Sequence, residues 1–366
     1  MADPRYQKLA QVLIQYSLSI KPGDKLVVRG TIPAAPLIRE VVREAIRAGA
    51  HPTTRASIDG LAEILLKEGS DEQLSYLSPL DLKEVEHFDA SLNILGDENT
   101  KSLSGVDPKR VAMLGQARAP LLETLMQRAA RDELRWSLTL FPTNAHAQDA
   151  GMSLSDYEDF VFAAGLIDQD DPVAAWREVD REQQRIIDYL SQHDEIRIVA
   201  PDTEVTYRVG GRTWINASGT RNFPDGEVFT GPIEDSVTGS VRFTYPAVYL
   251  GREVEDIRLR FEGGRVVEAS AARGEDLLHS MLDMDEGARY LGEVAFGLNY
   301  GIQRFTRNIL FDEKIGGTMH MAVGRSYPDT GGKNESALHW DMICDLREGQ
   351  VYADGELCYE RGKFVI

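Results

Sequence analysis

The hydrophobic periodicity of the chain changes near its middle, and this change limits the folds available to it. In the first half, short apolar runs such as residues 25–29 (KLVVR) and 135–140 alternate with stretches of helical period such as residues 108–131. Strand–helix alternation predicts a parallel sheet in an α/β domain. Residues 150–194 then have a helical pattern throughout, and Ser155 and Glu158 have the spacing of a capping box.

After this helical stretch the period becomes two, which is typical of half-buried strands. TEVTYRV and RTWINAS flank Gly210-Gly211, and EDIRLRF and RVVEASA flank Glu262-Gly263-Gly264, so each pair predicts a hairpin. A chain of 366 residues also exceeds the usual size of a single hydrophobic core. We therefore predict an α/β N-terminal domain with a helical C-terminal part at residues 1–190, and a mainly antiparallel α+β domain at residues 191–366.

Charge and composition exclude several classes of function. The chain has 59 acidic and 40 basic residues, a formal charge of −19, which repels nucleic acid and anionic membrane surfaces alike. Cys344 and Cys358 are too few for a disulfide framework. The beginning of the chain lacks the pattern of a signal peptide, and no apolar run reaches the roughly 20 residues of a membrane span. We expect a cytoplasmic protein without nucleic-acid or membrane partners.

The segment ALHWDMICDL contains the first candidate metal ligands, His339 and Asp341. Apolar residues alternate with them, so a strand would place both on one face. Imidazole nitrogen and carboxylate oxygen are preferred ligands of zinc, cobalt, manganese and iron. Alone, however, such a pair is more often the polar edge of an amphipathic strand.

Three further ionisable residues lie in apolar, glycine-bounded segments: His320 in GGTMHMAVGRSYP, Glu227 in NFPDGEVFTGP and Glu293 in YLGEVAFGLN. A buried charge is costly unless it is paired or binds a metal. A satisfied core histidine and solvent-facing glutamates at strand ends are the alternatives when each residue is considered singly.

Four of these segments, in order, resemble the metal-binding signature of the aminopeptidase T and aminopeptidase S family of metallopeptidases: FPDGEVFTGP, GEVAFGLN, GGTMHMAVGRSYP and LHWDMI. LIQYSLSIKPGDKLVV, AQDAGMSLSDYEDFVF and TRNILFDEKIGGTMH also look like family segments, so the resemblance extends over nearly the whole chain. The stretch between Tyr327 and His339 is shorter than is typical of the family. By motif position, the resemblance implies metal ligands at Glu227, Glu293, His320, His339 and Asp341, and a catalytic side chain at Tyr327.

The resemblance implies a metal-dependent aminopeptidase that uses two divalent ions, zinc, cobalt or manganese, to activate a water molecule. Glu293 is expected to combine metal ligation with proton transfer, and Tyr327 to hydrogen-bond the developing oxyanion. Short peptides with a free N-terminus are the implied substrates, and a homodimer is the implied assembly.

Two other functions remain open at this point. His320, His339 and Asp341 alone form the two-histidine, one-carboxylate set of mononuclear iron oxygenases, and ring-cleaving dioxygenases resemble this peptidase fold. A one-iron site does not require Glu227 and Glu293, so their presence favours hydrolysis. The other possibility is a non-catalytic protein that binds peptides or metal, which the presence of Tyr327 disfavours.

Overall fold

The computed structural model describes residues 3–249 and 251–366, and the chain divides into two compact units. The first unit ends at Trp176 and also contains Gly219–Pro224, and the second comprises Arg177–Ser218 and Asp225–Ile366. The division falls within helix α9, which runs from Pro172 to Leu190. The domain boundaries that we predicted, residues 1–190 and 191–366, stay a prediction.

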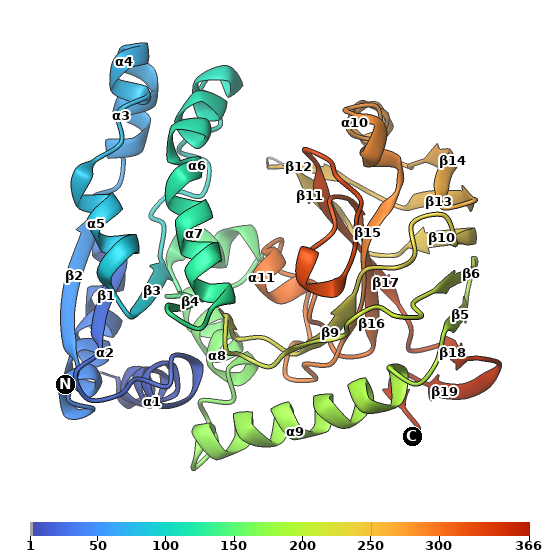
Figure 1. Cartoon of the computed structure of the whole chain (residues 1–366), viewed down its shortest axis with the longest axis horizontal. Coiled ribbons are helices and arrows are strands. Elements are labelled where there is room, and N and C mark those ends of the chain that lie inside the picture. The colour runs from blue at the N-terminus through green and yellow to red at the C-terminus, as the bar shows by residue number, and fades with distance from the viewer. Residues whose placement is uncertain (1–2, 250) are drawn as a thin grey trace. The chain divides into compact units, whose positions relative to one another are not determined.

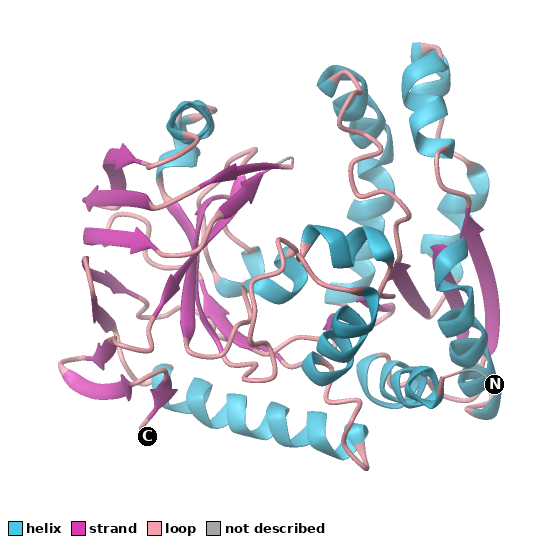
Figure 2. Ribbon diagram, turned by 180° about the vertical axis from the view of Figure 1, so that it is seen from behind, coloured by secondary structure: helices cyan, strands magenta, loops and turns pink. Residues whose placement is uncertain are grey.

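The first unit is built on a parallel sheet, as the alternation of strands and helices predicted (Figures 1 and 2). Its strand order is β2-β1-β3-β4-β8, and neighbouring strands pair in parallel. The strands are β1 (Lys25–Thr31), β2 (His51–Ser57), β3 (Ala90–Leu95), β4 (Arg135–Leu140) and β8 (Asn222–Phe223). The last of these lies in Gly219–Pro224, the segment that returns to this unit.

Helix α2 (Ala35–Arg47) illustrates how the helices of this unit can bury one face. In α2, Leu37, Val41 and Ala45 are buried on one face. The predicted capping box is wrong, because α8 begins two residues earlier and Ser153 accepts the Asp156 N–H at its N-terminus. The helices are α1 (Pro4–Val12), the π-helical η1 (Leu13–Ser17), η2 (Ile32–Ala34), α2 (Ala35–Arg47), α3 (Leu61–Glu68), α4 (Asp71–Leu74), α5 (Pro79–His87), α6 (Pro108–Ala130), α7 (Asn144–Asp149) and α8 (Leu154–Ala164).

The second unit is mainly antiparallel, as predicted. Among the described residues, one sheet has the order β14-β13-β10-β6-β5-β18-β19-β20, another has the order β17-β16-β15-β9-β7, and β11 pairs with β12. The first sheet consists of β5 (Glu195–Ala200), β6 (Thr203–Arg208), β10 (Thr238–Phe243), β13 (Ile257–Glu262), β14 (Arg265–Ser270), β18 (Gln350–Ala353), β19 (Glu356–Glu360) and β20 (Lys363–Phe364). The others are β7 (Ile215–Ala217), β9 (Glu227–Thr230), β15 (Leu291–Gly297), β16 (Thr318–Gly324), β17 (His339–Asp345), β11 (Ala247–Tyr249) and β12 (Arg252–Val254).

One of the two predicted hairpins is confirmed and the other is wrong. Strands β13 and β14 pair antiparallel on either side of their glycine turn. In contrast, β6 pairs with β5 and β10, whereas β7 pairs with β9 in the other sheet. The Gly210-Gly211 turn therefore carries the chain from one sheet to the next. Short helices complete the unit: α10 (Glu275–Leu282), η3 (Glu286–Arg289), α11 (Ile309–Asp312) and η4 (Pro328–Thr330).

The core of the second unit lies against one face of the β17-β16-β15-β9-β7 sheet. Val294, Phe296, Met319, Met321 and Met342 belong to a large buried cluster that also includes residues of the other sheet. Strands β15 and β16 are buried along their whole length, so the opposite face of these central strands is also shielded from water. Among the described residues, none of the helices combines the length and apolar character of a membrane span.

Candidate metal centre

The register of the β17-β16-β15-β9-β7 sheet places the five predicted ligands on one face. Glu293 is directly opposite Ala322, which is directly opposite Asp341. Directly opposite residues of antiparallel strands point to the same side, so the two acids share a face. By the same register, all five predicted ligands lie on this face: Glu227 on β9, Glu293 on β15, His320 on β16, and His339 and Asp341 on β17.

One bulge and one glycine shape the strands that carry these side chains. The register of β15 against β16 shifts between Leu291 and Glu293, and such a bulge re-aims the side chain that follows it. Gly324, opposite His339, has a φ of 100°, and a Cβ there would lie 2.2 Å from the Leu338 carbonyl oxygen. Only glycine fits this position without strain.

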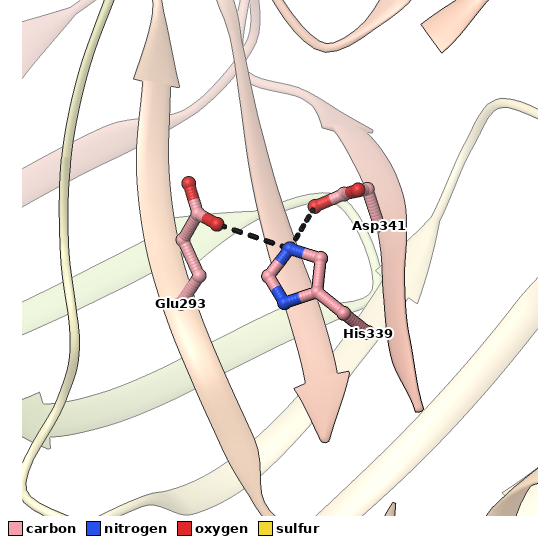
Figure 3. A group of neighbouring side chains, drawn as sticks. All are labelled: Glu293, His339 and Asp341. Atoms are coloured by element: carbon pink, nitrogen blue, oxygen red, sulfur yellow. Dashed lines mark ion pairs between the residues drawn. The ribbon is translucent and has the colours of Figure 1, made fainter. Parts of the chain in front are cut away.

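The carboxylate of Glu293 lies between the two histidines. Its Oε2 is 3.3 Å from Nε2 of His339, and its Oε1 is 3.5 Å from Nε2 of His320. Figure 3 shows the His339 ring between the Glu293 and Asp341 carboxylates. Its Nε2 is also 3.6 Å from Oδ1 of Asp341. His320 Nε2 is also 3.5 Å from Oε2 of Glu227. The two imidazoles therefore face carboxylates with the same ring nitrogen.

Backbone carbonyls fix the orientation of both rings. Nδ1 of His320 lies 3.0 Å from the Glu313 carbonyl oxygen, and Nδ1 of His339 lies 2.8 Å from that of Arg325. A carbonyl oxygen can only accept a hydrogen bond, so each Nδ1 carries a hydrogen and each Nε2 is turned toward the carboxylates. Metal-binding histidines are typically held in this way.

The carboxylates around the two histidines raise the pKa of both imidazoles. Burial lowers the pKa of His320, but the neighbouring Glu293 and Glu227 carboxylates outweigh it and raise that pKa to about 10. Burial also lowers the pKa of His339, but the Asp341 and Glu293 carboxylates outweigh this effect and raise that pKa to about 11. Both shifts reflect excess negative charge around the two rings.

The structure adds a residue that our sequence analysis missed, Glu313, which follows α11. Ligand atoms of Glu313, His320 and Asp341 lie within 4.8 Å of one another, as do those of Glu293, His339 and Asp341. Asp341 is common to both groups. Glu313 lies in a loop between charged neighbours, so no periodicity in the sequence distinguishes it from a solvated acid.

A lysine also enters the cluster, which the sequence did not suggest. Lys314 is fully buried, and its Nζ contacts Oε1 of Glu313. The same Nζ is 3.6 Å from Oε1 of Glu227 and 3.8 Å from Oδ1 of Asp225. Burial lowers the pKa of Lys314, but these carboxylates more than compensate and hold it well above its usual value.

Tyr327 lies beside the predicted ligands, just beyond β16. Its ring centre is 4.9 Å from that of His339 and 5.7 Å from that of Phe229. The residue is 44% exposed. Partial burial and the charges of Glu293 and Asp341 raise the pKa of the phenol. The hydroxyl is therefore neutral, and it can donate a hydrogen bond near the cluster.

A family model described as thermophilic metalloprotease (M29) matches residues 2–364. The chain belongs to this family. The predicted resemblance to the aminopeptidase T and S family is thereby confirmed, and so is the predicted enzyme class, a metalloaminopeptidase that hydrolyses peptide bonds. Membership in the M29 family also implies a divalent metal cofactor.

Named relatives of this M29 chain match it over almost its full length. It is 33% identical to aminopeptidase 2 of Geobacillus stearothermophilus, covering 97% of this chain and 95% of the relative. It is 29% identical to aminopeptidase T of Thermus thermophilus, covering 98% of each. The solved structure of wild-type AmpT from Thermus thermophilus superposes with a TM-score of 0.85 at 28% identity, covering 99% of both chains. This likeness confirms the predicted fold class.

A more distant likeness concerns the fold alone. The structure of 2,5-dihydroxypyridine dioxygenase from Pseudomonas putida has a TM-score of 0.59 at 15% identity, covering 99% of this chain and 96% of that one. The M29 architecture is thus similar to that of an oxygenase, so function must be argued from the side chains of the site.

The donor set of this M29 chain fits a divalent ion. Carboxylate oxygens and imidazole Nε2 atoms converge from four strands and a loop, and they are the ligand types that zinc, cobalt and manganese accept. Within the described part of the chain, Oε2 of Glu227 is buried and accepts no hydrogen bond. A bound cation would satisfy this oxygen, which otherwise carries a desolvation cost.

Proposed function

We propose that this chain is an aminopeptidase that removes N-terminal residues from short peptides with the help of two divalent ions. Zinc, cobalt and manganese suit the mixed oxygen and nitrogen donors. The proposed ligands are Glu227, Glu293, Glu313, His320, His339 and Asp341.

The observation that supports two ions most strongly is the position of Glu293. Each of its carboxylate oxygens faces a different histidine, at 3.3 and 3.5 Å. A carboxylate that presents its two oxygens to two imidazoles is suited to bridge two ions. Asp341 is common to both ligand groups and supports the same conclusion.

A pair of divalent ions, when bound, lowers the pKa of water and polarises a carbonyl group. The buried Glu293 carboxylate can accept a proton from that water and return it to the leaving amine. The neutral Tyr327 hydroxyl can donate a hydrogen bond to the oxygen of the scissile carbonyl as negative charge develops there. The carbonyls of Glu313 and Arg325 keep both imidazoles in place throughout.

Peptide cleavage tests this function directly. The chain, loaded with cobalt, zinc or manganese, is assayed on aminoacyl arylamides and on short peptides with free or acetylated N-termini. We expect cleavage of the free peptides, none of the acetylated ones, and loss of activity with a chelator. Equal cleavage of acetylated peptides would contradict the aminopeptidase assignment.

A mononuclear iron oxygenase is the second candidate, because the dioxygenase has a similar fold. The three buried or half-buried glutamates at positions 227, 293 and 313 weigh against it, since two histidines and one carboxylate are sufficient for such iron sites. One iron per chain without peptide cleavage would favour this candidate.

We also propose a cytoplasmic homodimer. The two described cysteines, Cys344 and Cys358, are free and buried, which agrees with a reducing compartment.

Helix α6 buries none of its residues, and it exposes Val111, Leu122 and Met126. Apolar groups exposed along such a helix are suited to contact a second copy. Light scattering coupled to size-exclusion chromatography distinguishes a dimer from a monomer.

A further inference from the structure

Lys314 places a buried amino group among the carboxylates at one end of the candidate metal centre. It has no exposed surface, and its Nζ contacts carboxylate oxygens of Glu313, Glu227 and Asp225. Glu227 and Asp225 are themselves buried, with exposed fractions of 5% and 2%. A buried ammonium requires such partners, and they in turn require a cation.

The charges of the cluster explain how a lysine and two divalent ions can be accommodated together. Among the described residues, the five carboxylates that contact Lys314 or belong to the two ligand groups carry five formal negative charges. Two divalent ions supply four positive charges and Lys314 supplies the fifth, so the set is neutral if both histidines are uncharged ligands. The carboxylates are Asp225, Glu227, Glu293, Glu313 and Asp341.

The ammonium is not shared equally by the two ligand groups. It contacts Glu313, which belongs to the group with His320 and Asp341. Within the described residues, Lys314 forms no ion pair with Glu293, which belongs to the other group alone, or with Asp341, which is common to both. An ion held by Glu313 would therefore have a like charge bound to the same carboxylate, whereas an ion held by His339 would not.

We propose that Lys314 makes the two metal positions unequal. The position formed by Glu313, His320 and Asp341 binds its ion more weakly than the position formed by Glu293, His339 and Asp341. The inference rests on the two-ion centre of the proposed function. Its physical cause is repulsion between the ammonium and the nearby ion in a site that excludes water, together with competition for oxygens of Glu313 and Glu227. Lys314 is thus a positioning residue that sets metal occupancy.

Two variants separate the charge of Lys314 from its contribution to folding. Lys314→Met removes the charge and keeps a long, flexible side chain. It also removes the Lys314 ammonium from Asp225 and Glu227, so folding of the metal-free chain can suffer. The double variant Asp225→Asn with Lys314→Met removes one acid together with the base and preserves the charge balance. Lys314→Arg, which keeps the charge, is the matched control.

The test is a titration of metal-free protein with cobalt(II), followed by the visible absorption of bound cobalt and by the amount of metal retained per chain. In the wild type, we expect two separate binding steps. In the double variant, we expect the weaker step to tighten about tenfold or more, while the tighter step changes little, as is typical of coupling energies between neighbouring sites. Lys314→Arg should retain the two unequal steps.

Two equal steps in the wild type would overturn the inference, and so would a second step that stays unchanged in the double variant. Neither result bears on peptide cleavage. Conversely, absence of cleavage by protein that carries both cobalt ions would refute the proposed function and leave the inequality of the two positions standing.

Discussion

His339 and Asp341 converge although both belong to one strand: Nε2 of the histidine lies 3.6 Å from Oδ1 of the aspartate. Their spacing of two residues on β17 puts them on the same face, and the Arg325 carbonyl turns the imidazole toward the acid. This pair forms one side of the proposed metal centre, so it is the natural place to test ligation.

His339→Ala should remove one ion from the chain. The variant loses the only imidazole of the Glu293, His339 and Asp341 group, and we expect the metal content to fall from two ions to one with peptide cleavage reduced at least about 100-fold. Bound metal is measured by mass spectrometry after dialysis. His279→Ala, on α10 and outside both ligand groups, is the control. Full metal content in His339→Ala would refute ligation.

Tyr327→Phe should separate catalysis from metal binding. The phenyl ring keeps the contacts with His339 and Phe229, whereas the hydroxyl donor is lost. We expect unchanged metal content and a kcat lower by roughly 100-fold, as for removal of one donor to a developing oxyanion. Steady-state kinetics on an aminoacyl arylamide measure the change. Wild-type kcat in this variant would exclude the assigned role.

Gln183→Ala should destabilise the second unit and loosen the strand that carries Glu227. The buried Gln183 amide donates to Oδ1 of Asn216 and to the carbonyl oxygens of Ala217 and Glu227. The substitution leaves these acceptors without this donor, and the free energy of unfolding should fall by about 2 kcal/mol. Urea unfolding measures the change.

The adjacent Gln184 offers a matched control for this measurement. It is exposed, and among the described residues its side chain donates to Asp188, one helical turn away on α9. Gln184→Ala should change the free energy of unfolding by less than about 0.5 kcal/mol. Equal effects of the two substitutions would contradict a special role for Gln183.

Asp285 should contribute stability that depends on pH. The Ala337 N–H and the Ser336 hydroxyl donate hydrogen bonds to the Asp285 carboxylate at 2.8 and 2.7 Å, and both donors lie just before His339 in the sequence. The bond from Ala337 is the main cause of the lowered pKa of Asp285. Because the pKa of Asp285 is lower in the folded chain than in the unfolded chain, its contribution to stability is fully present above the pKa of the unfolded state. That contribution is lost as the pH falls through the pKa of the folded state. Asp285→Ala should therefore cost about 1 kcal/mol at pH 7 and progressively less in acid.

Unfolding curves between pH 7 and pH 2.5 measure this difference. The exposed neighbour Glu286 provides the comparison, since Glu286→Ala should have a small effect at every pH. A penalty for Asp285→Ala that stays constant down to the lowest pH would show that its charge makes no contribution.

The sequence predicted those parts of the fold and site that depend on local pattern. A period of two was sufficient to place His339 and Asp341 on one face, and strand–helix alternation was sufficient to predict the parallel sheet. The strand predicted at residues 135–140 matches β4 in full.

Features that depend on distant contacts could not be predicted. Glu313 and Lys314 follow a single helical turn, and only the packing of that loop against the sheet brings them to Glu227 and His320. The Gly210-Gly211 turn looks like a hairpin, but β7 pairs with β9 and leaves β6 in the other sheet. In both cases tertiary pairing, rather than local preference, decides where the segment lies.

The central claim is that two divalent ions on this chain hydrolyse the N-terminal bond of short peptides. Counting bound ions per chain by native mass spectrometry, while the same sample is assayed on one peptide with a free and an acetylated N-terminus, tests it most directly. We predict two ions per chain, cleavage of the free peptide alone, and loss of both ions and cleavage with chelator. A single iron per chain in a sample that cleaves neither peptide would contradict the account.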